Sequence, residues 1–272
     1  MKIIKTIVGF AGVAALSLSQ TVSAECIPGV RNLLKQAAED AATQTTGGYS
    51  LNMWLTYVDQ TGKVCEVVTS NEDATGEMAG NAAWLGSRVI SAQKAFTANA
   101  FSLDGYAIST ANLFSAVQPG GSLYGLQHSN PVDASTAYTG DPNAYGTEND
   151  PLMGHRVGGI NVFGGGLAIY FNGKKMGAIG VSGDTSCRDH AFAWNVRKSL
   201  NLEPGGNGIT TVNMDASGAV QTPLAGAVVG DEMIINADGD SSSYWDAWSH
   251  SACPNSIGLG DERNAANGVI LN

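Results

Sequence analysis

The chain has 272 residues, of which only 14% are charged, and its formal net charge is −10 at neutral pH. We expect no binding to nucleic acid, because phosphate backbones are bound through clusters of lysine and arginine that an acidic chain lacks. For the same reason, we do not expect the chain to bind anionic membranes. Glycine is abundant, at 35 residues, and 43% of the residues are hydrophobic, which is typical of a turn-rich globular protein.

Residues 1–24 have the features of a cleavable secretory signal peptide. Lys2 and Lys5 supply positive charge, residues 7–18 are largely apolar, and small residues precede a cleavage point before Glu25. The apolar stretch is shorter than the roughly 20 residues that a membrane-spanning helix needs. We therefore expect an exported protein, periplasmic or extracellular, with no membrane span after processing.

Hydrophobic periodicity predicts helices and strands up to residue 202. Helical spacing of apolar residues predicts helices over 27–41, 85–100, 110–117 and 192–200. Strand patterns cover residues 51–57, 63–69, 160–163, 167–171 and 174–182. Between the last two strands, Asn172-Gly173 predicts a two-residue hairpin turn, because both positions need a positive φ. Short turns between strands, with the helices grouped, favour an α+β fold in which helices pack on an antiparallel sheet.

Two long segments lack periodicity. Residues 128–159 contain three loop-forming dipeptides that end in proline and predict a long inserted loop. Residues 203–272 are rich in Gly, Asn, Ser and Asp and predict an irregular C-terminal extension. The expected organisation is a signal peptide at 1–24, a domain at 25–202 and an extension at 203–272.

Four cysteines lie beyond the signal peptide: Cys26, Cys65, Cys187 and Cys253. An even number of cysteines in an oxidising compartment predicts two disulfide bonds. Zinc is not expected, because the chain has no C-x-x-C pair. The sequence allows three pairings, and we favour Cys26–Cys253 with Cys65–Cys187, since a covalent tie would help to order the extension.

No pattern predicts catalytic residues. The stretch Gly164–Gly166 lacks the Lys-Ser/Thr of a phosphate-binding loop, and Ser182 lacks the G-x-S-x-G elbow of a hydrolase. Acidic residues between 236 and 246 do not have the spacing of a calcium loop.

Three stretches carry a resemblance to a known family: Asp59 with Gly62, Ala92-x-Lys94-Ala95-x-Thr97-Ala98, and Phe163 to Gly183 followed by Asp189. Together they resemble the GlcG/HbpS-like haem-binding family, which includes the C-terminal domain of PduO-type proteins. The resemblance implies a five-stranded antiparallel sheet flanked by helices, a homo-oligomer, and haem or a related tetrapyrrole as a small-molecule ligand. Two alternatives stay open: an enzyme that acts on a small organic acid or degrades haem, and a scaffold whose loop and extension bind a partner.

A haem site needs an axial ligand to iron, most often His, Met, Cys or Tyr. His155 is our first candidate and His128 the second, because both flank the long loop and loops on a rigid scaffold commonly carry ligands. Met153 offers another donor, and Arg156 offers a cation for a propionate. Lys94 lies off the apolar stripe of its helix, so it is either solvated or paired with an acidic group such as a propionate. His190 and His250 are not favoured, since one lies in a packed helix and the other in the extension.

Overall fold

The fold is described from a computed structural model of the chain. It describes residues 25–45, 47–70, 84–211, 213–214, 220–221, 223–224, 227–235, 247–253, 263–265 and 268–271. The predicted signal peptide and the acidic residues at 236–246 lie outside these ranges. Within them, no helix is both long enough and apolar enough to cross a membrane.

Four antiparallel strands form the main sheet, in the order β2-β1-β4-β3. The strands are β1 (Trp54–Asp59), β2 (Val64–Thr69), β3 (Gly166–Phe171) and β4 (Lys174–Ser182). The turn between β3 and β4 has φ values of 50° at Asn172 and 74° at Gly173, so the predicted hairpin is confirmed.

The sheet has four strands and not the five that we expected. Residues 160–163 do not join it, because their backbone groups pair elsewhere. The N–H of Ile160 donates to the carbonyl of Asn130, and the N–H of Asn161 donates to the hydroxyl of Thr97. The apolar run therefore indicated the burial of Ile160 and Val162 correctly, but not a strand, and Phe163 is exposed.

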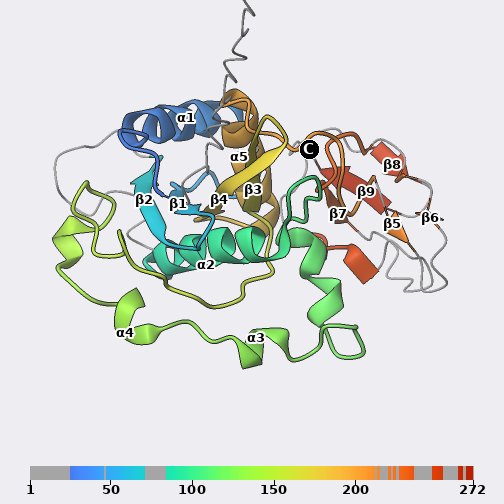
Figure 1. Cartoon of the computed structure of the whole chain (residues 1–272), viewed down its shortest axis with the longest axis horizontal. Helices are drawn as coiled ribbons and strands as arrows, with labels where there is room; N and C mark the ends of the chain where they lie inside the picture. The colour runs from blue at the N-terminus through green and yellow to red at the C-terminus, as the bar shows by residue number, and fades with distance from the viewer. Residues whose placement is uncertain are drawn as a thin grey trace, which may run out of the picture.

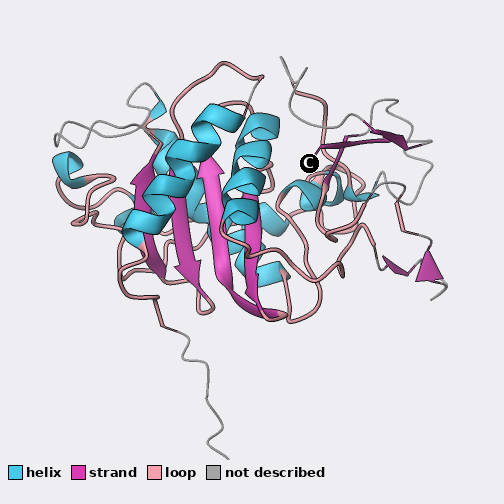
Figure 2. Ribbon diagram, turned by 90° about the horizontal axis from the view of Figure 1, so that it is seen from above, coloured by secondary structure: helices cyan, strands magenta, loops and turns pink. Residues whose placement is uncertain are grey.

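Helices cover both faces of the sheet (Figures 1 and 2). α1 (Arg31–Gln44) and α5 (Ser186–Ser199) lie on one face, and α2 (Gly86–Phe101) lies on the other. Alternation along β1 explains the two layers, since Leu55 packs toward α1 and α5 while Trp54 packs toward α2. The α+β class and the helices that flank the sheet are confirmed.

The remaining elements are short. Along the chain they are η2 (Ala111–Leu113), η3 (Ser115–Val117), α3 (Leu126–Ser129), α4 (Ala134–Ala137) and η4 (Pro142–Ala144). The extension contributes β5 (Asn213–Met214), β6 (Val220–Gln221), β7 (Met233–Ile235), β8 (Arg263–Ala265) and β9 (Gly268–Leu271). These strands form two small sheets beside the main one (Figure 1).

The long loop is held against α2 by a buried ion pair. The Arg88 guanidinium binds the carboxylate of Asp150, which also accepts the backbone N–H groups of Gly146 and Leu152 at 2.7 and 2.9 Å. Arg88 also lies 3.6 Å from the ring centroid of Tyr145. A segment without periodicity is thus ordered by charge and hydrogen bonds.

The chain forms two disulfide bonds, as predicted, but the pairing that we favoured is wrong. The bonds are Cys26–Cys65, with Cα atoms 5.3 Å apart, and Cys187–Cys253, with Cα atoms 6.0 Å apart. Cys26 precedes α1, which packs beside β2 and so brings it to Cys65. The extension does have a covalent tie, as expected, but it leads to the beginning of α5.

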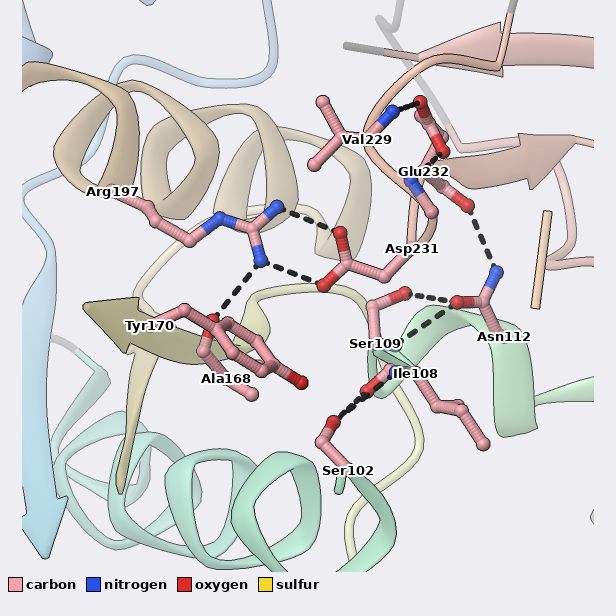
Figure 3. A network of polar contacts seen from close by, with 12 residues as sticks. Ser102, Ile108, Ser109, Asn112, Ala168, Tyr170, Arg197, Val229, Asp231 and Glu232 are labelled. Atoms are coloured by element: carbon pink, nitrogen blue, oxygen red, sulfur yellow. Dashed lines mark hydrogen bonds and ion pairs between the residues drawn. The ribbon is translucent and has the colours of Figure 1, made fainter. Parts of the chain in front are cut away.

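A second buried ion pair attaches the extension to the domain (Figure 3). Two nitrogens of Arg197 on α5 donate to the two carboxylate oxygens of Asp231, each at 2.7 Å, and one of them also donates to the carbonyl of Ala168 at 3.1 Å. Next to it, Glu232 accepts the N–H groups of Val228 and Val229. The Arg197–Asp231 pair therefore attaches the extension to the domain, and Glu232 orders the backbone of the extension itself.

We expect Gly180→Ala to destabilise the protein, because α2 crosses β4 in contact with Gly180. A Cβ at this position would press on the carbonyl oxygen of Ser91 and the backbone nitrogen of Ala95. Overpacking of this kind costs about 1–3 kcal/mol of unfolding free energy. Chemical denaturation measures the loss. Gly86→Ala is the control, since nothing lies within 4 Å of its Cβ. Equal stability of the two variants would contradict the close packing of α2 on β4.

Candidate functional site

The family-like residues Lys94 and Asp189 form a buried ion pair. Lys94 comes from α2 and Asp189 from the first turn of α5, and the ammonium nitrogen lies 2.7 Å from a carboxylate oxygen. The ammonium also donates to the carbonyl of Val181 at 3.0 Å. The second carboxylate oxygen of Asp189 accepts the N–H of Asp184 at 2.9 Å. Lys94 is therefore not solvated, and its partner is an acidic group of the protein itself.

Glycine at position 165 leaves room for this pair. Gly165 has a φ of 117°, and a Cβ there would press first on the carbonyl oxygen of Val181, and would lie 3.0 Å from the Cβ of Asp189 and 3.3 Å from the Lys94 nitrogen. The triple glycine before β3 thus lets the chain approach a buried charge closely.

Burial dominates the electrostatics of the pair. It lowers the pKa of Lys94 below its usual value, and it raises the pKa of Asp189 to about 6, while each partner opposes the shift of the other. Both side chains are almost completely enclosed, at 1% and 3% exposed. A propionate at the surface would therefore not meet the Lys94 ammonium.

Two histidines lie buried beside this pair. His190 is on α5, and among the described residues no group forms a hydrogen bond with either of its ring nitrogens. His250 lies against the segment that contains η2 and η3, and the centroid of its ring is 4.7 Å from that of Phe114. Burial lowers the pKa of His190 well below its usual value and that of His250 to about 4. Both imidazoles are neutral near pH 7 and keep a lone pair.

The two favoured histidines lie elsewhere, on the surface. His155 and His128 are both exposed. The flanks of the long loop pair with each other, since Asp133 donates to Val157 and Ile160 donates to Asn130. In this antiparallel pairing, His155 and His128 fall at opposite ends. The structure therefore does not bring them together as ligands of one iron in one chain.

Met153 and Arg156 accompany His155 along the edge of β2. The segment is fixed to that strand, because Gly154 donates to the carbonyl of Val64 and Val64 donates to the carbonyl of His155, both at 2.8 Å. Met153 is half-buried, while Arg156 is exposed and donates to the carbonyl and hydroxyl oxygens of Thr61 at 2.8 and 2.6 Å. The three residues thus share a rigid surface segment.

Sequence reasoning gave little weight to His190 and His250 as ligands. A signal for them exists in the spacing, because each stands three residues from a cysteine, in Cys187-x-x-His190 and His250-x-x-Cys253. A search for C-x-x-C pairs does not detect such mixed pairs. In the structure, the Cys187–Cys253 disulfide brings these two Cys/His motifs together.

We expect Lys94→Met to lower the unfolding free energy by about 3–5 kcal/mol, because it leaves the buried Asp189 carboxylate without its partner. Thermal or denaturant unfolding measures the effect. Lys174→Met is the control, because its ion pair with Asp104 is solvent-exposed and such pairs contribute about 1 kcal/mol or less. If the two variants unfolded alike, the buried pair would not be a structural element.

Similar proteins were found by sequence and by structure. An "uncharacterized 15.0 kDa protein in dhaT-dhaS intergenic region" of Citrobacter freundii is 37% identical over 84 residues, which are 31% of this chain and 41% of that protein. The chain thus matches less than half of the length of that relative.

Three solved structures are similar at lower levels. Klebsiella pneumoniae ORFY is 26% identical, with a TM-score of 0.41 and coverage of 62% of this chain and 86% of that one. A structure described as a PduOC:heme complex is 23% identical, with a TM-score of 0.43 and coverage of 65% and 97%. A double mutant of Streptomyces reticuli HbpS is 18% identical, with a TM-score of 0.41 and coverage of 71% and 98%.

The family model described as "Haem degrading protein HbpS-like" matches residues 59–197. This range is just over half of the chain. It begins at Asp59, the last residue of β1, includes Lys94 and Asp189, and ends at Arg197. The chain belongs to the HbpS-like family.

Proposed function

We propose that the protein binds haem or a related tetrapyrrole. Membership of the HbpS-like family, over a range that contains β2, β3, β4, α2 and most of α5, is the observation that carries this proposal. Fold alone does not establish a ligand, so the residues must also offer suitable donors.

His155 fits the requirements of an axial ligand. Its imidazole is exposed, and its backbone is held against β2, so the ring stands on a rigid edge. Haem iron commonly takes a histidine ligand, and bound haem would supply the redox chemistry of its iron. Arg156 uses its Nε and one terminal nitrogen toward Thr61, which leaves other N–H groups of its five for a propionate.

His128 is the second candidate and belongs to a separate surface. It is exposed near the end of α3, where Tyr124 is 63% exposed and offers an aromatic face. Met153 is half-buried, so it suits packing against a macrocycle better than a second axial bond. Arg156 replaces Lys94 in this proposal as the cation for a propionate, because the Lys94 ammonium is enclosed.

Titration with haemin tests the proposal. We expect the parent protein to give a saturable Soret shift, and His155→Ala to weaken binding by about tenfold or more through loss of a ligand. His128→Ala should bind as the parent does, and Gln127→Ala is the matched control for a change on α3. If both histidine variants kept the parent's Soret position and affinity, this ligation would be wrong. No saturable shift in the parent would refute haem binding itself.

Haem degradation is a second candidate, because the description of the family names it. The same haemin complex can distinguish the two functions. Incubation in air with ascorbate and catalase leaves the Soret band of a pure binding protein stable, whereas a degrading enzyme bleaches it over time. We favour binding, since the sequence predicts no catalytic residues.

We further propose that the protein is exported and forms a homo-oligomer. Two disulfides support an oxidising compartment. The exposed aromatic side chains of Tyr124 and Tyr138, at 63% and 65%, give an interface something to bury. Light scattering of the full chain should show a mass that is a multiple of the protomer. A strict monomer across micromolar concentrations would contradict the oligomer.

A further inference from the structure

The beginning of α5 and the end of the described extension form a compact group of sulfur and imidazole donors. A ring nitrogen of His250 and the two Sγ atoms of the Cys187–Cys253 disulfide all lie within 4.8 Å of one another. Cys187 and His250 are buried, and Cys253 is half-buried. Thiolate and imidazole are the donors that zinc prefers in closed sites.

His250 is oriented as a metal-binding histidine usually is. Its Nδ1 lies 2.7 Å from the carbonyl oxygen of Ser251, which can only accept, so Nδ1 carries the proton and Nε2 carries the lone pair. Nε2 is buried, and among the described residues it has no hydrogen-bond partner. Metal-binding histidines typically donate their other N–H to a carbonyl in this way. A buried, unpaired acceptor of this kind calls for an explanation.

The sulfur atoms lie where a thiolate would be stabilised. The Sγ of Cys253 lies 3.2 Å from the backbone nitrogen of Cys187, which donates to it, and 3.4 Å from the hydroxyl of Ser186. Both groups belong to the first turn of α5, whose N-terminus favours negative charge. The local field therefore favours deprotonated sulfur once the disulfide is open.

A second imidazole stands next to this group. His190 lies one turn along α5 from Cys187, and residues three apart share a helix face. Both of its ring nitrogens are buried and lack a partner among the described residues. Buried imidazole nitrogens without a hydrogen-bond partner therefore lie on two separate segments, α5 and the extension.

We propose that the Cys187–Cys253 disulfide is the oxidised form of a zinc-class metal site made by Cys187, Cys253 and His250. A dithiol reductant opens it, passing two electrons and two protons to the disulfide and itself becoming a disulfide. Binding of Zn²⁺ then releases the two thiol protons and forms two sulfur bonds and one nitrogen bond. The fourth position takes water. This site requires no haem and stands independently of the proposed ligand.

Access to the disulfide suits an attack at Cys253. Its neighbours Ser251 and Ala252 are exposed, whereas Cys187 is fully enclosed in α5. A reductant would therefore meet Cys253 first and leave Cys187 as the departing thiolate at the helix N-terminus. Because the same bond ties the extension to the domain, metal would restore the tie that reduction removes.

Cobalt substitution tests the proposal in the full chain. The protein is reduced with a phosphine, which avoids a competing thiol, and Co²⁺ is added without oxygen. We expect thiolate-to-cobalt charge-transfer absorption in the reduced protein, its loss when Zn²⁺ is added, and no such absorption in the oxidised protein. His250→Gln should weaken Co²⁺ binding by about tenfold or more.

The other disulfide supplies the matched control. Cys26→Ser/Cys65→Ser should keep the absorption, and Cys187→Ser/Cys253→Ser should abolish it while circular dichroism reports the fold. Absorption that persisted without Cys187 and Cys253, or a folded reduced parent without absorption, would overturn the proposal. So would a reduced parent that unfolds and does not recover when Zn²⁺ is added.

Discussion

The guanidinium of Arg197 is the point on which the arrangement of the extension depends. It comes from α5, binds the carbonyl of Ala168 on β3, and holds both carboxylate oxygens of Asp231 in the extension. Its side chain and that of Asp231 are fully enclosed. Enclosing two charges is costly unless their geometry is good and their remaining hydrogen bonds are satisfied. The bidentate contact supplies the geometry, and the carbonyl of Ala168 satisfies one further N–H, while Nε of Arg197 is buried without a partner among the described residues. The pair therefore fixes one arrangement of helix, strand and extension.

Two further buried ion pairs join segments that the packing of apolar side chains alone does not hold together. Arg88 and Asp150 hold the long loop to α2, and Lys94 and Asp189 join α2 to α5. Each of the three pairs begins on a helix, whose position is set by apolar packing on the sheet. Each carboxylate then accepts further contacts or lies beside a segment of irregular backbone. Apolar packing thus positions the cations. Arg88 and Arg197 then position parts of the chain that lack a hydrophobic pattern, while Lys94 links two helices.

This division explains what could be predicted from the sequence. Helices and strands with clear periodicity, and the Asn172-Gly173 turn, depend on local preferences, so their prediction was largely correct. The fifth strand was wrong because the partners of residues 160–163 are Asn130 and Thr97, which no local pattern reveals. The disulfide pairing failed for the same reason, since it depends on which helix packs beside which strand. Lys94 and Asp189 were both singled out through a family resemblance, but their pairing, and the place of the His190 and His250 imidazoles beside it, become visible only in three dimensions.

The two proposed chemistries lie at opposite edges of one sheet. His155 and Arg156 follow the edge strand β2, which the long loop covers. Cys187 and His250 lie toward β3, where the extension joins α5. The family match ends at Arg197, so the β2 edge, Cys187 and His190 fall within the shared range, while His250 and Cys253 do not. The extension therefore supplies two of the three proposed ligands at the second edge. A change there can alter metal binding and the tie to α5 while the surface around His155 stays as it is.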